Sequence, residues 1–119
     1  MSITANIAKI RETLPSNVKL VAVSKFKPVS SIIEAYEAGE RAFAESRPQE
    51  FVQKVQQLPA DIEWHFIGPL QTNKIKFVVP YASLIQSVDS EHLLVAIENY
   101  AAGIDKIQDV LLELNIARE

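Results

Sequence analysis

The chain has 119 residues, of which 48% are hydrophobic and 23% are charged, and its formal net charge is -3. These values are typical of a soluble globular protein that is long enough to bury one core. The weak negative charge gives no electrostatic reason to expect nucleic acid or an anionic membrane as a partner. The absence of cysteine excludes disulfides and thiolate metal sites.

Metal-binding and targeting signals are also missing from the sequence. The two histidines, His65 and His92, form no close cluster with carboxylates, so we expect no zinc or iron site. The sequence shows no signal peptide and no apolar run of membrane-spanning length. We therefore expect a cytoplasmic protein that does not insert into a membrane.

Helices alternate with strands along the chain in the predicted secondary structure. Apolar residues recur at helical spacing in some segments, as at Ile3, Ile7 and Ile10, and form short continuous runs in others, as at 21–23. Proline and glycine separate these segments. The predicted helices are 2–14, 28–38, 48–57, 71–79 and 90–102, and the predicted strands are 19–24, 42–44, 62–67, 83–88 and 110–116.

Several helix ends are predicted from their capping residues. Ser2 or Thr4 can cap the first helix, and Asp89 or Ser90 the last one, because each side chain offers an oxygen to a free backbone N–H group. Glycine readily adopts the left-handed conformation that ends many helices. The glycines expected to end the second and the last helix are Gly39 and Gly103.

The regular alternation of strands and helices predicts parallel βα units with right-handed crossovers. Two architectures fit this pattern. One is a doubly wound open sheet, which has helices on both faces. The other is the front part of a TIM-type (β/α)8 barrel, a fold that normally needs about 250 residues.

Polar residues inside the strands favour the barrel. In the predicted third strand, Glu63 and His65 share one face, and Trp64 and Phe66 share the other. The fifth strand is predicted to divide in the same way, with Glu113 and Asn115 opposite Leu112 and Leu114. A sheet covered by helices on both faces has little use for such polar residues, whereas the interior of a barrel near an active site does. We therefore predict an α/β fold with about five parallel strands of a barrel.

A lysine ends the predicted first strand. Lys25 follows the apolar run 21–23, and the strand ends there because Pro28 comes soon after. Ligands and reactive groups of α/β folds lie at the carboxyl ends of strands. Partial burial and the nearby charge of Lys27 would favour the free amine, which can attack a carbonyl and form a Schiff base. The alternative is that Lys25 is simply a solvated surface charge.

Polar residues also follow the second and third strands, in the segments 44–50 and 65–74. One interpretation is that these segments converge with Lys25 on a single ligand. In the other, Ser46 caps a helix, His65 is a hydrogen-bonded core residue, and Lys74 is solvated beside the start of a helix at 71–73. The residues alone leave both interpretations open.

Three motifs carry a resemblance to a known family. They are VAVSKFKP at 21–28, FAESRPQE at 43–50 and WHFIGPLQTNK at 64–74. In their order and spacing they resemble the pyridoxal phosphate homeostasis proteins of the YggS/PROSC family. These proteins bind pyridoxal 5'-phosphate (PLP) on a barrel like the N-terminal domain of alanine racemase. The resemblance spans essentially the whole chain.

The resemblance implies a cofactor and a set of residues that bind it. Lys25 would form the Schiff base with PLP, Ser46 and His65 would lie near the cofactor, and Asn73 and Lys74 would border the pocket. It also implies a carrier or homeostasis role without a demonstrated substrate. The chain departs from the family at 44–46, where Ala-Glu-Ser replaces the common Gly-Glu-Asn.

Family members are substantially longer than this chain, so we expect residues 1–119 to form a single partial domain, the N-terminal part of a PLP-binding barrel. The loops that hold the PLP phosphate in the family would follow residue 119. The three glycines are too scattered to form a phosphate cradle here. Unpaired strand edges would favour self-association. The alternatives are a PLP-dependent enzyme of the racemase type and a truncated fragment that no longer binds PLP.

Overall fold

A computed structural model describes residues 2–113 of the chain. Its five strands form one parallel sheet in the order β1-β2-β3-β4-β5. The strands are β1 (Ala22–Val23), β2 (Ala42–Glu45), β3 (Glu63–Phe66), β4 (Leu84–Val88) and β5 (Asp109–Leu112). The helices are α1 (Ile3–Thr13), α2 (Val29–Glu37), α3 (Pro48–Gln57), the 3-10 turn η1 (Thr72–Lys74), α4 (Ile75–Val78) and α5 (Glu91–Gly103).

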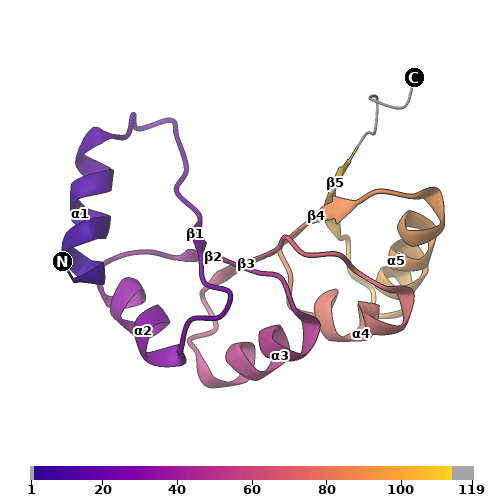
Figure 1. Ribbon diagram of the computed structural model, residues 1–119. Coiled ribbons are helices and arrows are strands. Elements are labelled where there is room, and N and C mark those ends of the chain that lie inside the picture. The colour runs from indigo at the N-terminus through magenta and orange to yellow at the C-terminus, as the bar shows by residue number, and fades with distance from the viewer. Residues whose placement is uncertain (1, 114–119) are drawn as a thin grey trace.

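The helices that connect the strands all cover the same side of the sheet. Figure 1 shows α2, α3, α4 and α5 following one another in an arc below the strands, while α1 stands beside α2. Each strand pairs with the next one in sequence, and the order never reverses. A doubly wound sheet requires helices on both faces and a reversal of strand order. The prediction of a barrel's front part is therefore confirmed for the described residues.

The register of the strands gives the sheet two different faces. Phe43 pairs with Trp64 on the face that packs against the helices, and Ala44 pairs with His65 on the other face. We call this second face, opposite the helices, the inner face. Side chains alternate between the faces along each strand, so the predicted division of β3 into an apolar face and a polar face is confirmed.

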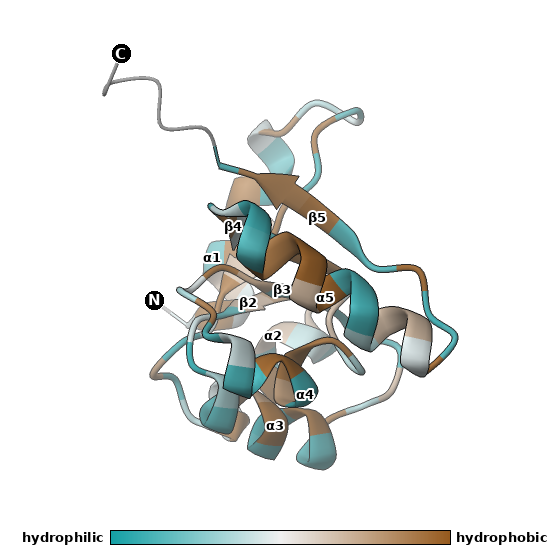
Figure 2. Ribbon diagram, turned by 90° about the vertical axis from the view of Figure 1, so that its right-hand side faces the viewer, coloured by the Kyte–Doolittle hydropathy of each residue, from teal (hydrophilic) through white to brown (hydrophobic). Residues whose placement is uncertain are grey.

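The core lies between the sheet and the helices, with Phe51 of α3 at its centre. The Phe51 ring is fully buried, and its centroid lies 5.5 Å from that of Trp64 and 6.0 Å from that of Phe66. Figure 2 shows an apolar stripe on α5, whose buried members are Leu93, Ile97 and Ala101. Aromatic packing of this kind supplies a large share of a small core's stability.

The predicted helix ends agree with the structure. The side chains of Ser2 and Ser90 accept hydrogen bonds from the backbone N–H groups of the first turns of α1 and α5. Gly39 has a φ of +105° two residues after the end of α2, as the prediction requires. The last helix, α5, ends at Gly103 as predicted, and the left-handed conformation that follows is adopted by Asp105 (φ 56°). Asp tolerates this region better than most residues.

The first strand is shorter than predicted. Regular pairing in β1 covers Ala22–Val23 alone, whereas the prediction began at Lys19. The side chain of Lys19 instead reaches Glu63 on β3. Pairing in β5 ends at Leu112, Glu113 is exposed, and the predicted continuation over 114–116 lies outside the described residues.

Gly68 allows the ends of two strands to approach each other closely. A Cβ atom at this position would overlap the backbone carbonyl of Ser46. The carbonyl of Gly68 also accepts a hydrogen bond from the hydroxyl of Ser87, which lies near the carboxyl end of β4. The absence of a side chain at Gly68 therefore keeps the carboxyl ends of β2, β3 and β4 together.

The substitution Gly68→Ala should destabilise the protein by about 1–3 kcal/mol, because the new methyl group forces backbone rather than a flexible side chain to move. Gly103→Ala is the matched control. A Cβ at Gly103 would meet nothing within 4 Å, and alanine favours a helix more than glycine does. This substitution should therefore be neutral or stabilise the protein by up to about 1 kcal/mol. Urea unfolding measures the change in unfolding free energy for each variant. Equal changes in the two variants would contradict this explanation.

Candidate functional site

The carboxyl ends of the first four strands meet at one edge of the sheet. The amide of Ser24 donates to the Ala44 carbonyl at 2.9 Å, and the amide of Ile67 donates to the Glu45 carbonyl at 2.8 Å, so the pairing continues beyond the regular strands. Lys25, Ser46 and Gly68 then follow in neighbouring positions. These three strand ends therefore lie side by side, and their convergence on one ligand stays a prediction.

Lys25 lies in a tight turn directly after β1. The turn is closed by a hydrogen bond of 3.0 Å from the Lys27 amide to the Ser24 carbonyl, and Phe26 has a φ of 65°. A positive φ is uncommon for a bulky residue and indicates that neighbouring groups hold the backbone there. Lys25 and Lys27 are both exposed among the described residues, so the predicted partial burial of Lys25 is not observed.

His65 lies on the inner face and is hydrogen-bonded at both ring nitrogens. Nε2 lies 2.7 Å from a carboxylate oxygen of Glu63, and the Gln86 side-chain nitrogen lies 3.0 Å from Nδ1. An ionised carboxylate only accepts, and an amide nitrogen only donates. In this arrangement Nε2 donates to Glu63 and Nδ1 accepts from Gln86. His65 is 6% exposed, so it is a buried and fully paired histidine.

Lys19 extends this arrangement to the amino end of the sheet. Its ammonium lies 2.5 and 2.6 Å from the two carboxylate oxygens of Glu63. The hydrogen bonds from Lys19 and His65 hold the pKa of Glu63 below its ordinary value of 4.5. Glu63 therefore stays ionised at neutral pH, which fixes the tautomer of His65.

Ser46 and Asn73 differ in how they relate to this edge. Ser46 is half-buried, and its backbone contacts the position of Gly68. The N-cap of α3 is Arg47, so the alternative prediction that Ser46 caps the helix is wrong. Asn73 is exposed and lines a surface pocket with Ala96 and Tyr100 of α5, apart from Lys25 and His65. Its contact with a cofactor stays a prediction.

A buried ionic cluster beneath the Lys25 turn was not predicted from the sequence. We call it the Lys54 cluster, and its members are Ser24, Glu45, Glu50 and Lys54. The Lys54 ammonium lies 2.8 Å from the Ser24 carbonyl and 2.9 Å from one oxygen of each carboxylate. The Ser24 hydroxyl donates to the same Glu45 oxygen at 2.5 Å. A glutamate at the end of the apolar strand 42–45 was the available sequence signal.

Burial affects the two carboxylates of the Lys54 cluster differently. Glu45 is fully buried, and this burial raises its pKa in spite of the hydrogen bonds from Ser24 and Lys54. Burial opposes the ionisation of Glu50 as well, but hydrogen bonds from Lys54 and from the Phe26 amide outweigh it and lower the Glu50 pKa. Glu50 is therefore the firmly ionised partner of Lys54.

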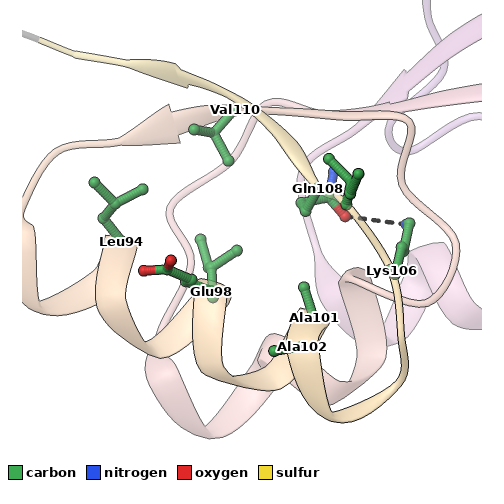
Figure 3. Close-up of a pocket in the computed structure, with 9 residues that line it drawn as sticks. Leu94, Glu98, Ala101, Ala102, Lys106, Gln108 and Val110 are labelled. Carbon is green, nitrogen blue, oxygen red and sulfur yellow. Dashed lines mark hydrogen bonds between the residues drawn. The ribbon is translucent and has the colours of Figure 1, made fainter.

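A pocket of about 490 Å³ lies between α5 and β5, away from the predicted site residues. Figure 3 shows Leu94 and Glu98 on the helix and Val110 on the strand across from them. The Lys106 ammonium at one end donates to the carbonyls of Val79 and Ala82 and to Gln108. Burial lowers the pKa of Lys106. Because these carbonyls occupy its donors, Lys106 has a structural role.

Membrane-spanning helices and metal-ligand clusters are both absent from residues 2–113. None of their helices is long and apolar enough to cross a membrane. Within the same residues, no group of three or more histidine or acidic side chains is arranged to hold a metal ion.

The comparison with protein families identifies the class of fold and site. The family described as "Alanine racemase, N-terminal domain" matches residues 1–118. The chain therefore belongs to the alanine racemase N-terminal domain family. A pyridoxal phosphate homeostasis protein of Pasteurella multocida is 39% identical over 132 residues, which cover 100% of this chain and 57% of the relative. The resemblance noted in the sequence is confirmed.

Solved structures agree with this assignment. The chain matches PipY of Synechococcus elongatus, solved with PLP bound, with a TM-score of 0.90 and 37% identity over 97% of this chain and 55% of PipY. Alanine racemase from E. faecalis matches with a TM-score of 0.69 and 19% identity, over 82% of this chain and 27% of the racemase. This match shows a shared fold. The chain thus spans about half the length of PipY and of the Pasteurella relative.

The substitution Glu63→Gln should reduce stability by less than about 1 kcal/mol, because Glu63 is partly exposed to solvent. A lowered pKa adds stability above the unfolded-state pKa, and this stability is lost as the pH falls through the folded-state value. The difference from the wild type should therefore be present above pH 4.5 and vanish at lower pH. Urea unfolding at a series of pH values measures it, with the exposed Glu37→Gln as control. A difference that grows on acidification would contradict the assignment.

Proposed function

We propose that this chain binds PLP through a Schiff base between the cofactor aldehyde and the Lys25 amine. The observation that carries the proposal is the exposed Lys25 in a held turn at the carboxyl edge of a parallel sheet. Such edges are where barrel proteins bind their ligands. The names of the relatives and the PLP-bound PipY structure support the choice of cofactor.

The residues at this edge fit one end of PLP. Lys25 offers a primary amine for the aldehyde, and Ser46, half-buried after β2, offers a hydroxyl for hydrogen bonding. His65 and Gln86 give the inner face a polar surface below. PLP supplies an electrophilic carbon and an electron-withdrawing ring when bound. The phosphate sites of barrels typically follow strands 7 and 8, and the structure describes five strands.

We further propose a carrier or homeostasis role rather than catalysis. His65, the histidine of the site, is buried and engaged with Glu63 and Gln86, so it is arranged to hold a fixed position rather than to exchange protons with a substrate. A racemase-type enzyme is the second candidate, since alanine racemase shares the fold. Assays for amino-acid racemisation distinguish the two roles.

Self-association of the chain is a separate proposal that rests on its inner face. Val23 and Leu111, which alternate with residues that pack on the helices, are 55% and 51% exposed. Strands β1 and β5 each have one unpaired edge among the described residues. Exposed apolar side chains and free strand edges both favour pairing with another chain.

Incubation with PLP, borohydride reduction and peptide mass mapping test the proposed function. We expect one stable adduct on Lys25 and a visible absorption band before reduction. The substitution Lys25→Arg should abolish both, because it keeps the charge but removes the primary amine. Lys27→Arg is the matched control and should change neither. Adducts spread over Lys27, Lys74 and other lysines would contradict the assignment.

Light scattering with size-exclusion chromatography tests the self-association. The wild-type chain should elute as a dimer or larger species. The double substitution Val23→Lys and Leu111→Lys should shift it toward the monomer, because like charges then cover both ends of the inner face. A cooperatively folded wild-type monomer would disprove the proposal.

A further inference from the structure

We propose that Glu50 and Lys54 are positioning residues that hold the Lys25 turn in the geometry that presents its amine for PLP. The inference rests on the proposed function. The Lys54 cluster grips the chain on both sides of Lys25 without contacting Lys25 in the described structure. Both grips involve backbone atoms, so they act on the turn itself.

The first grip is on the carbonyl of Ser24. This oxygen accepts the hydrogen bond from the Lys27 amide that closes the turn, at 3.0 Å, and it also accepts from the Lys54 ammonium at 2.8 Å. A carbonyl has two lone pairs, so both bonds can form at once. The ammonium therefore fixes the first residue of the turn.

The second grip is on the amide of Phe26. This N–H group donates to a carboxylate oxygen of Glu50 at 2.9 Å, and that oxygen also lies 2.9 Å from the Lys54 ammonium. The Arg47 guanidinium covers the Phe26 ring, with its carbon 4.6 Å from the ring centroid. These contacts keep Phe26 in its left-handed conformation, which sets the direction in which Lys25 leaves the strand.

The composition of the cluster indicates specificity rather than stability. The three donors of the buried ammonium match its three acceptors, which lie on β2, on α3 and in the chain after β1. Removing an ammonium and two carboxylates from water is costly. Well-packed apolar residues in the same place often give an equally stable protein. The advantage of an ionic cluster at this place is that it defines the backbone geometry.

The test compares Glu50→Met with Glu50→Gln in the full chain. Methionine has a similar size but removes the acceptor for the Phe26 amide, whereas glutamine keeps an oxygen there. Hydrogen exchange of the Phe26 and Lys27 amides, followed by NMR without any ligand, should accelerate at least about tenfold in Glu50→Met. Glutamine should restore most of the protection, and the amides of β2 and β3 should not change.

The second readout uses PLP as the probe. In Glu50→Met the ratio of borohydride-trapped adduct at Lys25 to adduct at Lys27 should fall at least about tenfold, and Glu50→Gln should recover it. Lys54→Met, which removes the first grip and the ion pair with Glu50, should lower the ratio in the same way. Glu37→Met, an exposed change on α2, is the control and should alter neither readout.

The two readouts separate this inference from the proposed function. If the wild type forms no Lys25 adduct, the proposed function fails, and the exchange data alone decide whether the cluster holds the turn. If the adduct forms but Glu50→Met leaves its distribution unchanged, the positioning role is overturned even where exchange accelerates. Unchanged exchange in both Glu50→Met and Lys54→Met overturns it as well.

Discussion

The contact between the buried Lys54 ammonium and its three oxygen acceptors is the interaction on which the candidate site depends. It joins α3 to the end of β2 and to the chain that leaves β1. Each of these elements is held elsewhere by apolar packing, for example through Phe51. The ionic contact adds what apolar packing supplies poorly, a fixed direction for the backbone around Lys25. The position of the amine thus follows from charges that lie beneath the surface.

The two faces of the sheet carry different kinds of side chains. The face toward the helices carries the aromatic core, and Trp64 and Phe66 on β3 belong to it. The inner face of the same strand carries Glu63 and His65, which hydrogen bonds connect to Lys19 and Gln86. Strand alternation alone produces this division. Because all strands run in parallel, the loops that follow them begin at the same edge of the sheet, as in other barrels.

Sequence patterns predicted the order of elements and the barrel-type sheet, since these follow from local periodicity and from parallel strands. They predicted the start of β1 less well, because edge strands depend on neighbours far away in the sequence. The Lys54 cluster was missed for a related reason. No sequence pattern on α3 marks Lys54 as buried, and only the tertiary structure places it against Glu45.

A crystal structure of the chain with PLP tests the central claim most directly. The account predicts continuous electron density from the Lys25 side-chain nitrogen to the cofactor, with the ring over the inner face near His65 and the Lys54 cluster unchanged below. Cofactor density on another lysine, or in the pocket between α5 and β5, would contradict it.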